Sequence, residues 1–543
     1  PRQSPTLPRQ PPTAPMSDEE PAMPPADTAP QQLAAPTPPA VTPTPPGVPL
    51  PPFVDSVFGD LWPERGLAPR PDLVLGSVAV GAVAAVVLPY RNLGLGLLLV
   101  LLLSAGLVLS GSIRLRERWT ITSAAVGVGL ASLVVLRASE WLALVAIAVC
   151  GLLLTTALTG ARGLPAMAGG VASWVLAAVR GLPLLGRTLT AMSTVSSMWP
   201  LVRTVAISLV ALVVFGGLFA SGDAVFGSWA DAIIPDVTVD TVDSVVLRFF
   251  VGFAAGGTVL AACYVAINPP RVDRLDLPPG QRVTRAWEWL VPVGFVLAVF
   301  VAFVVAQATA MWGGHDYVQR TTGLTYAEYV HQGFGQLTAV TFLTLVTVAI
   351  AARKAPRGTG RDQLVLRVVL GTLSGLALVV VASALYRMHV YQEAYGFTVL
   401  RVLVDAFELW MGLLLVLVVV AGVRLSARWL PRAALLSGAL MVLVLGLANP
   451  EAWVAQRNID RYHASGQLDA VYLRELGPDA TPVIREGLPP RLGACITQDW
   501  SPEDDDWLAW NLGRARAASD VELALDPSEQ ASCNALVVSS STR

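Results

Sequence analysis

Three ionisable residues recur along a segment of the chain that is otherwise apolar. Arg401, Asp405 and Glu408 stand in FTVLRVLVDAFELWMGLLLVLVVVAG at spacings that place them on one face of a helix. A charge at the centre of a membrane costs about 2.5–3.5 kcal/mol on insertion scales, and less towards the ends. We therefore expect this face to meet protein or water. It is either a structural network of ion pairs between helices or the lining of a polar pathway.

The pairing of these charges leaves one of them in need of a partner. Arg401 and Asp405 lie one helical turn apart, so they can pair with each other. Glu408 then lacks a local partner, and Arg248 or Arg387 from other segments could serve. We predict an intramembrane polar stripe that consists of Arg401, Asp405, Glu408, Arg248 and Arg387.

A second group of polar residues crowds the start of another apolar run, in 325–337, TYAEYVHQGFGQL. Glu328 and His331 share one helical face there. His, Asp and Glu are zinc ligands, and His also titrates near neutral pH, but the spacings match no compact metal motif. A metal site or a proton-sensing site is one interpretation of an outer-face polar cluster made of His315, Asp316, Glu328, His331, His389 and Glu393.

The same segment has a simpler interpretation as the start of a membrane helix. Thr325 followed by Glu328 is the capping-box pattern, in which each side chain accepts a hydrogen bond from the other residue's backbone N–H. Tyr326, Tyr329 and Phe334 are typical of the aromatic belt at a membrane interface. We expect no cofactor, and the sequence leaves open whether a metal binds.

The elements that must position these residues are membrane helices. The chain has 543 residues, of which 54% are hydrophobic and 14% are charged, against roughly 25% charged in ordinary soluble domains. One water-soluble core cannot hide so much apolar surface, so we predict an all-α, polytopic transmembrane helix bundle. The net charge of −2 gives no indication of a nucleic-acid partner.

Eleven segments are apolar enough to span a membrane, which takes about 20 residues of helix each. They are 72–90, 92–110, 119–137, 139–160, 201–221, 245–267, 289–312, 332–352, 363–386, 399–423 and 430–449. The segment 164–179 could add a twelfth span. We interpret it as an interfacial helix with Trp174 and Val175 at the headgroups and Arg180 in water.

The distribution of basic residues orients these spans. With the N-terminus in the cytoplasm, most basic loop residues fall on the cytoplasmic side, among them Arg114, Arg116, Arg118, Arg271, Arg274, Arg353, Lys354, Arg357, Arg424 and Arg428. All four histidines and the C-terminal segment then lie outside. Arg-rich, Lys-poor composition suggests a bacterium, so we expect a multi-pass protein of the bacterial cytoplasmic membrane.

The parts of the chain outside the spans differ in composition. Residues 1–52 are Pro-rich and are predicted to be a disordered cytoplasmic tail, and 53–70 form a juxtamembrane linker before the transmembrane domain 71–449. Residues 450–543 are predicted to form a small helical extracytoplasmic domain. Its two cysteines would lie in an oxidising compartment, which predicts a Cys495–Cys533 disulfide.

Glycine spacing indicates where helices approach closely. Gly252 and Gly256, and likewise Gly371 and Gly375, are separated by three residues, the pattern of close helix contacts in membranes. We expect the spans at 245–267, 363–386 and 399–423 to form one bundle around the polar stripe.

Three motifs carry a resemblance to a known family. They are QRTTGLTYAEYVHQGFGQL at 319–337, YQEAYGFTVLRV at 391–402 and NPEAWVAQRNIDRYHASGQLDAVYLRELGPDATPVI at 449–484. In these motifs the chain resembles the bacterial family named domain of unknown function 4173 and its relative 4153, over roughly residues 200–490. The resemblance implies a multi-span membrane protein with a C-terminal extension. It supplies no catalytic residues.

The function predicted from these patterns is a non-catalytic sensor or scaffold in the membrane. The chain has no nucleophile elbow, phosphate loop or metal-binding motif. Its expected partners are the lipid bilayer and a protein that binds the Pro-rich tail or the outer domain. One alternative is a transporter or channel that uses the polar stripe and the outer-face cluster. Another is a membrane transferase at the outer leaflet.

Overall fold

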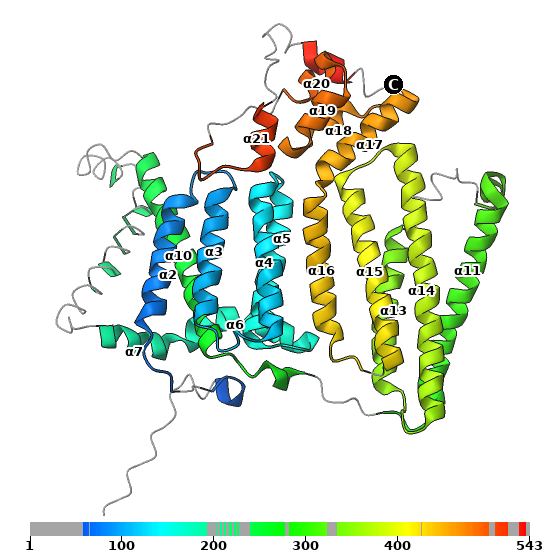
Figure 1. Ribbon diagram of the computed structural model, residues 1–543, viewed down its shortest axis with the longest axis horizontal. Coiled ribbons are helices and arrows are strands. Elements are labelled where there is room, and N and C mark those ends of the chain that lie inside the picture. Colours follow the sequence, from blue (N-terminus) through cyan, green and yellow to red (C-terminus); the bar gives the residue numbers. More distant parts are fainter. Residues whose placement is uncertain are drawn as a thin grey trace, which may run out of the picture. The chain divides into compact units, whose positions relative to one another are not determined.

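In a computed structural model of the chain, all secondary structure of the described residues is helical (Figure 1). The structure describes residues 58–63, 66–192, 239–276, 282–322, 334–424, 426–498, 505–519 and 532–538, with isolated positions between 204 and 226. For 239–242 and 310–322 it describes the backbone alone. The Pro-rich segment 1–52 lies outside this part of the chain. Of the predicted span 201–221, only isolated positions are described.

The first series of helices begins after the short 3-10 helix η1 (Gly59–Leu61). It comprises α2 (Pro71–Val87), α3 (Leu95–Ser110), α4 (Arg118–Leu136), α5 (Glu140–Thr159), α6 (Leu164–Arg180), α7 (Leu182–Met192) and α10 (Val239–Ile267), followed by η2 (Val272–Leu275). The second series comprises α11 (Trp287–Thr322), α13 (Phe334–Lys354), α14 (Gly360–Tyr395), α15 (Val399–Arg424) and α16 (Leu430–Leu447).

Within the described residues, eight helices are long and apolar enough to cross a membrane, and α2 and α3 are shorter apolar helices. The all-α polytopic prediction is therefore confirmed. α14 continues to Tyr395, well beyond the predicted end at 386. The extra turns read RMHVYQEAY, which is polar but free of Gly and Pro, so the helix continues where the apolar run stops.

The segment 164–179, expected at the interface, forms α6, which continues into α7 through a bend of 46°. In Figure 1 the two helices run across the ends of α2–α5. α6 buries Met167, Gly170 and Ala177 on one face and exposes Val171 and Val175 on the other. By length and composition this bent pair could also form one span.

The prediction that Arg180 lies in water is wrong. Its side chain is only 1% exposed, and its Nε donates to the carbonyl of Trp62 at 2.9 Å. The guanidinium also lies over the ring of Phe58, at 5.8 Å from the centroid. Arg180 is buried because the segment around η1 folds back onto α6.

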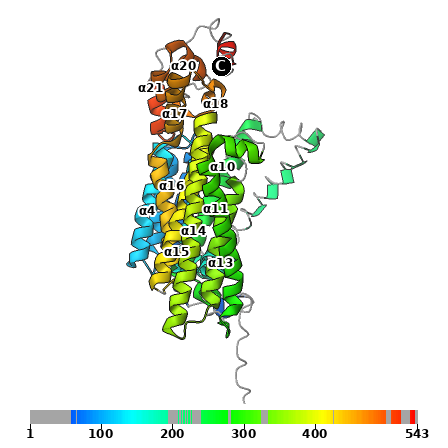
Figure 2. The same cartoon turned by 90° about the vertical axis from the view of Figure 1, so that its right-hand side faces the viewer.

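α16 stands between two groups of helices (Figures 1 and 2). On one side it packs against α4 and α5, so closely that a side chain at Gly446 would collide with Leu133. On the other side it packs against α15, where Trp410 Nε1 donates to Ser437 Oγ at 3.2 Å. We call α2–α5 with α10 the first half-bundle, and α11, α13, α14 and α15 the second half-bundle.

Close glycine packing occurs in the first half-bundle. Gly252 and Gly256 on α10 face Gly81 on α2, and a Cβ at Gly81 would lie 2.6 Å from the Gly252 carbonyl oxygen. α10 therefore packs on α2, and the expected bundle of α10, α14 and α15 is wrong. A Cβ at Gly371 or Gly375 would meet nothing within 4 Å, because α14 packs on its neighbours through larger side chains such as Leu373.

Short helices after α16 form what we call the C-terminal subdomain, the described residues from 450 to 538. They are α17 (Pro450–Ser465), α18 (Ala470–Arg474), η3 (Pro478–Ala480), α19 (Thr481–Gly487), α20 (Pro490–Ile496) and α21 (Leu512–Ser519). The core contains Ile459, Leu473 and Ile484, and a disulfide joins Cys495 to Cys533. Figure 2 shows these helices gathered at one end of the bundle, and Figure 1 shows α6 at the other end.

Candidate functional site

The deepest member of the predicted polar stripe is Glu408 on α15, whose exposed fraction is 0%. Its carboxylate accepts hydrogen bonds from Thr338 Oγ1 at 3.1 Å and from Thr341 Oγ1 at 3.4 Å, both on α13. A hydrogen-bonded carboxylate inside a bundle is costly to bury and tends to mark a functional position. Its partners are thus hydroxyl groups from a neighbouring helix.

Arg248 does not serve as the partner of Glu408. It lies on α10 in the first half-bundle, and its Nη1 donates to the carbonyls of Ala85 and Val86 on α2. Arg387 is buried on α14, which does belong to the second half-bundle. The structure thus separates Arg248 from the other residues of the predicted stripe.

Asp405 lies one turn from Glu408 on α15. Its Oδ2 accepts a hydrogen bond from Gln392 Nε2 at 2.7 Å, whereas Oδ1 is buried and has no hydrogen-bond partner among the described residues. The expected ion pair with Arg401 does not form. Arg401 instead donates to the Gly396 carbonyl and lies over the ring of Tyr391, 4.6 Å from the centroid.

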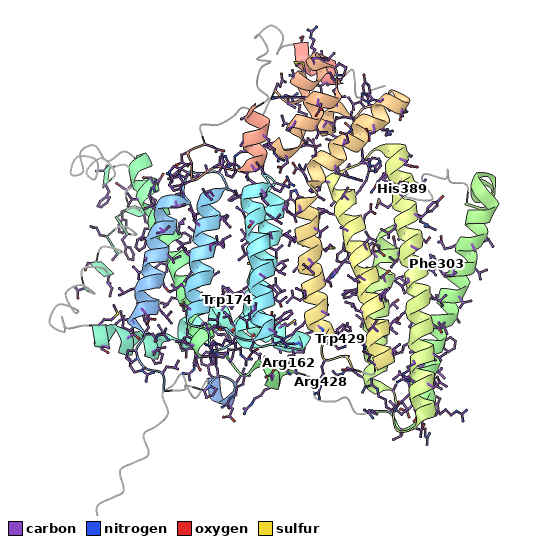
Figure 3. All side chains as sticks on the ribbon, viewed as in Figure 1. Arg162, Trp174, Phe303, His389, Arg428 and Trp429 are labelled. Atoms are coloured by element: carbon purple, nitrogen blue, oxygen red, sulfur yellow. A yellow bond between two sulfur atoms is a disulfide. The ribbon has the colours of Figure 1, made fainter. Side chains whose placement is uncertain are left out.

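Of the predicted outer-face polar cluster, one pair has described side chains. His389 Nε2 lies 3.2 Å from Glu393 Oε1, and both side chains are about 60% exposed. Figure 3 shows His389 at the end of α14 that faces the C-terminal subdomain. The side chains of His315 and Asp316 lie outside the described part of the chain. Thr325, Glu328 and His331 lie wholly outside it. The metal interpretation and the capping box therefore stay predictions.

The structure also shows a buried polar junction that we did not predict from the sequence. It joins the C-terminal subdomain to the loop between α4 and α5. The Ser139 hydroxyl donates to Glu451 Oε1 on α17, and the backbone N–H of Ala138 donates to Asp479 Oδ2 at 2.7 Å. Glu451 and Asp479 are only 6% and 5% exposed. The second oxygen of Glu451 accepts from the N–H of Gly477 at 3.1 Å.

The two carboxylates of this junction compete for one hydroxyl hydrogen. Ser139 Oγ lies 3.5 Å from Asp479 Oδ2 while it donates to Glu451, and a serine has one hydrogen to donate. Asp479 Oδ1 is buried and has no hydrogen-bond partner among the described residues. Burial, with a contribution from the nearby charge of Glu451, raises the pKa of Asp479 to about 6, although the Ala138 N–H and Arg137 oppose this.

The same subdomain binds the second half-bundle at the loop between α14 and α15. Asn458 on α17 accepts from the N–H of Phe397 at 2.9 Å and donates to the carbonyl of the same residue at 2.8 Å. The hydroxyl of Tyr472 accepts from the N–H of Val399 at 2.7 Å. Arg461 donates to the carbonyls of Glu393 and Ala394 at the end of α14.

A third contact joins the segment before α21 to the turn between α2 and α3. The N–H groups of Leu95 and Gly96 donate to the carbonyls of Trp510 and Leu508, at 3.0 and 2.6 Å. Asn511 donates to the carbonyls of Val134 and Arg137 at the end of α4. The subdomain thus contacts both half-bundles through backbone hydrogen bonds.

A signal for the junction was present in the sequence of α17. Its buried face consists of Pro450, Glu451, Val454, Ala455, Asn458 and Ile459. Two polar residues therefore stand within an apolar stripe at helical spacing. A buried polar side chain needs a partner, so this pattern indicates a polar contact with another element.

Long apolar helices packed around a few buried polar groups define a multi-pass integral membrane protein. A comparison with protein-family models sharpens this class. The family described as Domain of unknown function (DUF4153) matches residues 124–487, more than half of the chain, and the chain belongs to that family. Membership of the related family 4173 is not confirmed.

The family match begins within α4 and ends within α19, so it includes Ser139, Glu451, Asn458 and Asp479. No curated protein and no solved structure is significantly similar to the chain.

Proposed function

We propose that this protein is a non-catalytic membrane sensor or scaffold, in which the C-terminal subdomain couples the two half-bundles and presents their relative position to a partner. The proposal develops the first interpretation of the sequence. It rests on one observation, which is that a single helix holds loops from both half-bundles.

That helix is α17. Glu451 near its start binds the Ser139 loop of the first half-bundle, and Asn458 binds the Phe397 loop of the second. The two residues are seven positions apart, which corresponds to about 10 Å at 1.5 Å per residue. A helix of this length is stiff, so a shift of one loop relative to the other must break a contact at one end of α17 or move the whole subdomain.

Coupling can be tested with Asn458→Ala in the full chain, reconstituted in lipid nanodiscs. Gln456→Ala is the matched control, because Gln456 is exposed on the same helix and its side chain donates to the nearby Asp460. Hydrogen exchange would be measured at two loops, 396–399 and 137–140. If α17 couples the half-bundles, Asn458→Ala lowers protection at both loops. Loss confined to 396–399 would contradict the coupling.

A second candidate function is transport, for which the sequence suggested a transporter or channel without naming a substrate; we propose protons or small cations as that substrate. The observation in its favour is the pair of carboxylates on α15, where the buried Glu408 accepts from hydroxyl groups and Asp405 has an inaccessible oxygen with no hydrogen-bond partner among the described residues. Chains of buried acidic groups mark ion pathways in many membrane proteins. Proteoliposomes with a trapped pH indicator would compare the wild type with Asp405→Asn and Glu408→Gln. Loss of flux in correctly folded variants would favour transport over the scaffold.

We further propose that the protein lies in the bacterial cytoplasmic membrane with the C-terminal subdomain outside. Figure 3 shows Arg162 and Arg428 at the end of the bundle opposite this subdomain, and basic residues favour the cytoplasmic side. Ser465→Cys in the subdomain and Ser426→Cys at the opposite end give a matched pair of exposed positions. A membrane-impermeant thiol reagent applied to intact spheroplasts should label the first and spare the second, and the reverse result would invert the orientation.

A further inference from the structure

A cavity of about 520 Å³ lies where the turn after α2 meets the first turns of α10 and the 505–509 segment. Its lining includes Tyr90, Arg91 and Arg248 from the first half-bundle, and Asp505 and Asp506 from the C-terminal subdomain. The cavity opens to the surface, and charged side chains dominate its lining.

The charges around this cavity do not cancel. Arg91 pairs with Asp506 at 2.7 Å, and Arg514 pairs with Asp505 at 2.6 Å. Arg248 forms no ion pair with any carboxylate among the described residues. Its recorded contacts are two carbonyls of α2 and the ring of Tyr90, 5.9 Å from the centroid. Two arginines and two aspartates line the cavity, but Arg514, from outside the lining, already pairs with Asp505. The positive charge left without a carboxylate partner is that of Arg248, whose Nε and Nη2 have no hydrogen bond within the described part of the chain.

The position of Arg248 along α10 places this charge near a membrane surface. The apolar span of α10 runs from Asp243 to Ile267, so Arg248 stands in its second turn. On the other faces of the same turns of α10, Phe249, Phe250 and Phe253 are 62%, 66% and 72% exposed. An arginine at the headgroup level of a helix with exposed aromatic side chains stands where it can meet the phosphate of a phospholipid.

We propose that this cavity binds the phosphodiester of a phospholipid headgroup, with Arg248 as its principal ligand. A guanidinium matches the geometry of a phosphate through two parallel N–H donors, which a lysine cannot reproduce. The single negative charge of a phosphodiester neutralises the charge of Arg248. Because Asp505 and Asp506 come from the subdomain, a bound headgroup would also touch both sides of the subdomain's contact with α2 and α3.

The test is native mass spectrometry of the full-length protein, delipidated in detergent and titrated with phosphatidylglycerol or phosphatidylethanolamine. Arg248→Gln should lower the fraction of lipid-bound protein about tenfold for at least one of the two lipids, the loss expected for one charge-assisted contact. Arg248→Lys keeps the charge but not the paired donors and should give an intermediate value. Arg457→Gln, on the exposed face of α17, is the control and should bind lipid as the wild type does.

Two further measurements keep the result interpretable. Thermal unfolding of each variant in detergent shows whether Arg248→Gln is folded, and if it is not, the lysine variant carries the comparison. Inorganic phosphate added in excess separates a lipid site from a site for free phosphate. If the cavity is a lipid site, the lipid adducts persist in excess phosphate. If it is a site for free phosphate, simple competition removes them. Equal lipid binding by the wild type and Arg248→Gln, or an equal loss in Arg457→Gln, would overturn the proposal.

Discussion

Two regions of this protein hold pairs of carboxylates with inaccessible oxygens, and the hydrogen-bond donors to the two pairs differ. On α15, Asp405 and Glu408 accept hydrogen bonds from the side chains of Gln392, Thr338 and Thr341. At the subdomain junction, Glu451 and Asp479 accept from the backbone N–H groups of Gly477 and Ala138.

The difference follows from the surroundings of each pair. Inside a membrane span the backbone N–H groups are already used within the helices, so only side chains are left to bind a buried carboxylate. Between helices, loops offer free backbone donors, and a carboxylate that binds them also fixes the position of the loop. The stripe on α15 can therefore change its partners by side-chain rotation. The junction can change only if a loop moves.

The largest effect is expected at the junction. Glu451→Ala removes the acceptor for both the Ser139 hydroxyl and the Gly477 N–H. The hydroxyl is left with the more distant Asp479 Oδ2, at 3.5 Å, and the Gly477 N–H loses its acceptor. Each unpaired buried donor costs about 1–3 kcal/mol, so the free energy of unfolding of the subdomain should fall by about 2–5 kcal/mol. Glu475→Ala, at an exposed position of the same subdomain, should change it by less than about 0.5 kcal/mol.

Chemical denaturation followed by the fluorescence of subdomain tryptophans would measure both variants. Equal stability of Glu451→Ala and the control would mean that the junction does not hold the subdomain, and the contrast between the two carboxylate pairs would then disappear.

A smaller effect is expected from pH, through Asp479. Its pKa in the folded protein is about 6 against an ordinary value of 3.8, so the folded form binds this proton more tightly than the unfolded form does. The contribution of Asp479 to stability is therefore fully present below about pH 4, falls as the pH rises to about 6, and is level above that. A shift of about two units corresponds to about 3 kcal/mol.

The comparison that isolates this term is the wild type against Asp479→Asn, since other acidic groups titrate in the same range. The difference in unfolding free energy between the two proteins should change between pH 4 and pH 6 and stay constant from pH 7 to pH 8. Asp469→Asn, at a helix cap of the subdomain, serves as the control. A flat difference across the whole range would show that Asp479 is not the titrating group.

The smallest effect is expected on α15. Glu408→Gln keeps the size of the side chain and one oxygen that can accept from Thr338 or Thr341, and it removes a charge from the bundle interior. We expect the thermal unfolding temperature to stay within a few degrees of the wild type, because a change of 1 kcal/mol shifts it by only about 2–4 °C or less in a protein of this size. A large decrease would mean that the charge of Glu408 is needed for packing.

The sequence predicted the class of fold well because composition alone requires it. Long runs of Val, Leu and Ala must be buried in lipid or in one another, and their lengths indicate the spans. What it could not predict is which span lies beside which. The glycine spacing at 252–256 and at 371–375 is the same, yet the first pair meets Gly81 and the second meets open space.

The sequence also did not show which residues are the hydrogen-bond partners of the buried polar groups. Thr338 and Thr341 resemble any threonines in an apolar helix, and only the placement of α13 against α15 makes them ligands of Glu408. The charged pairings expected from opposite sign, Arg401 with Asp405 and Arg248 with Glu408, did not form, because arginines near helix ends reach backbone carbonyls at closer range.

The length of α14, 36 residues, affects how this helix responds to the thickness of the membrane. At 1.5 Å per residue it is about 54 Å long, whereas the hydrocarbon core of a bilayer is about 30 Å thick. Much of this helix therefore stands clear of the lipid tails as an unbroken rod that ends at the Phe397 loop. A thinner or thicker membrane changes the tilt of this helix, and the end farthest from the lipid then moves the most. The Asn458 contact therefore lies where a change in bilayer thickness produces the greatest displacement.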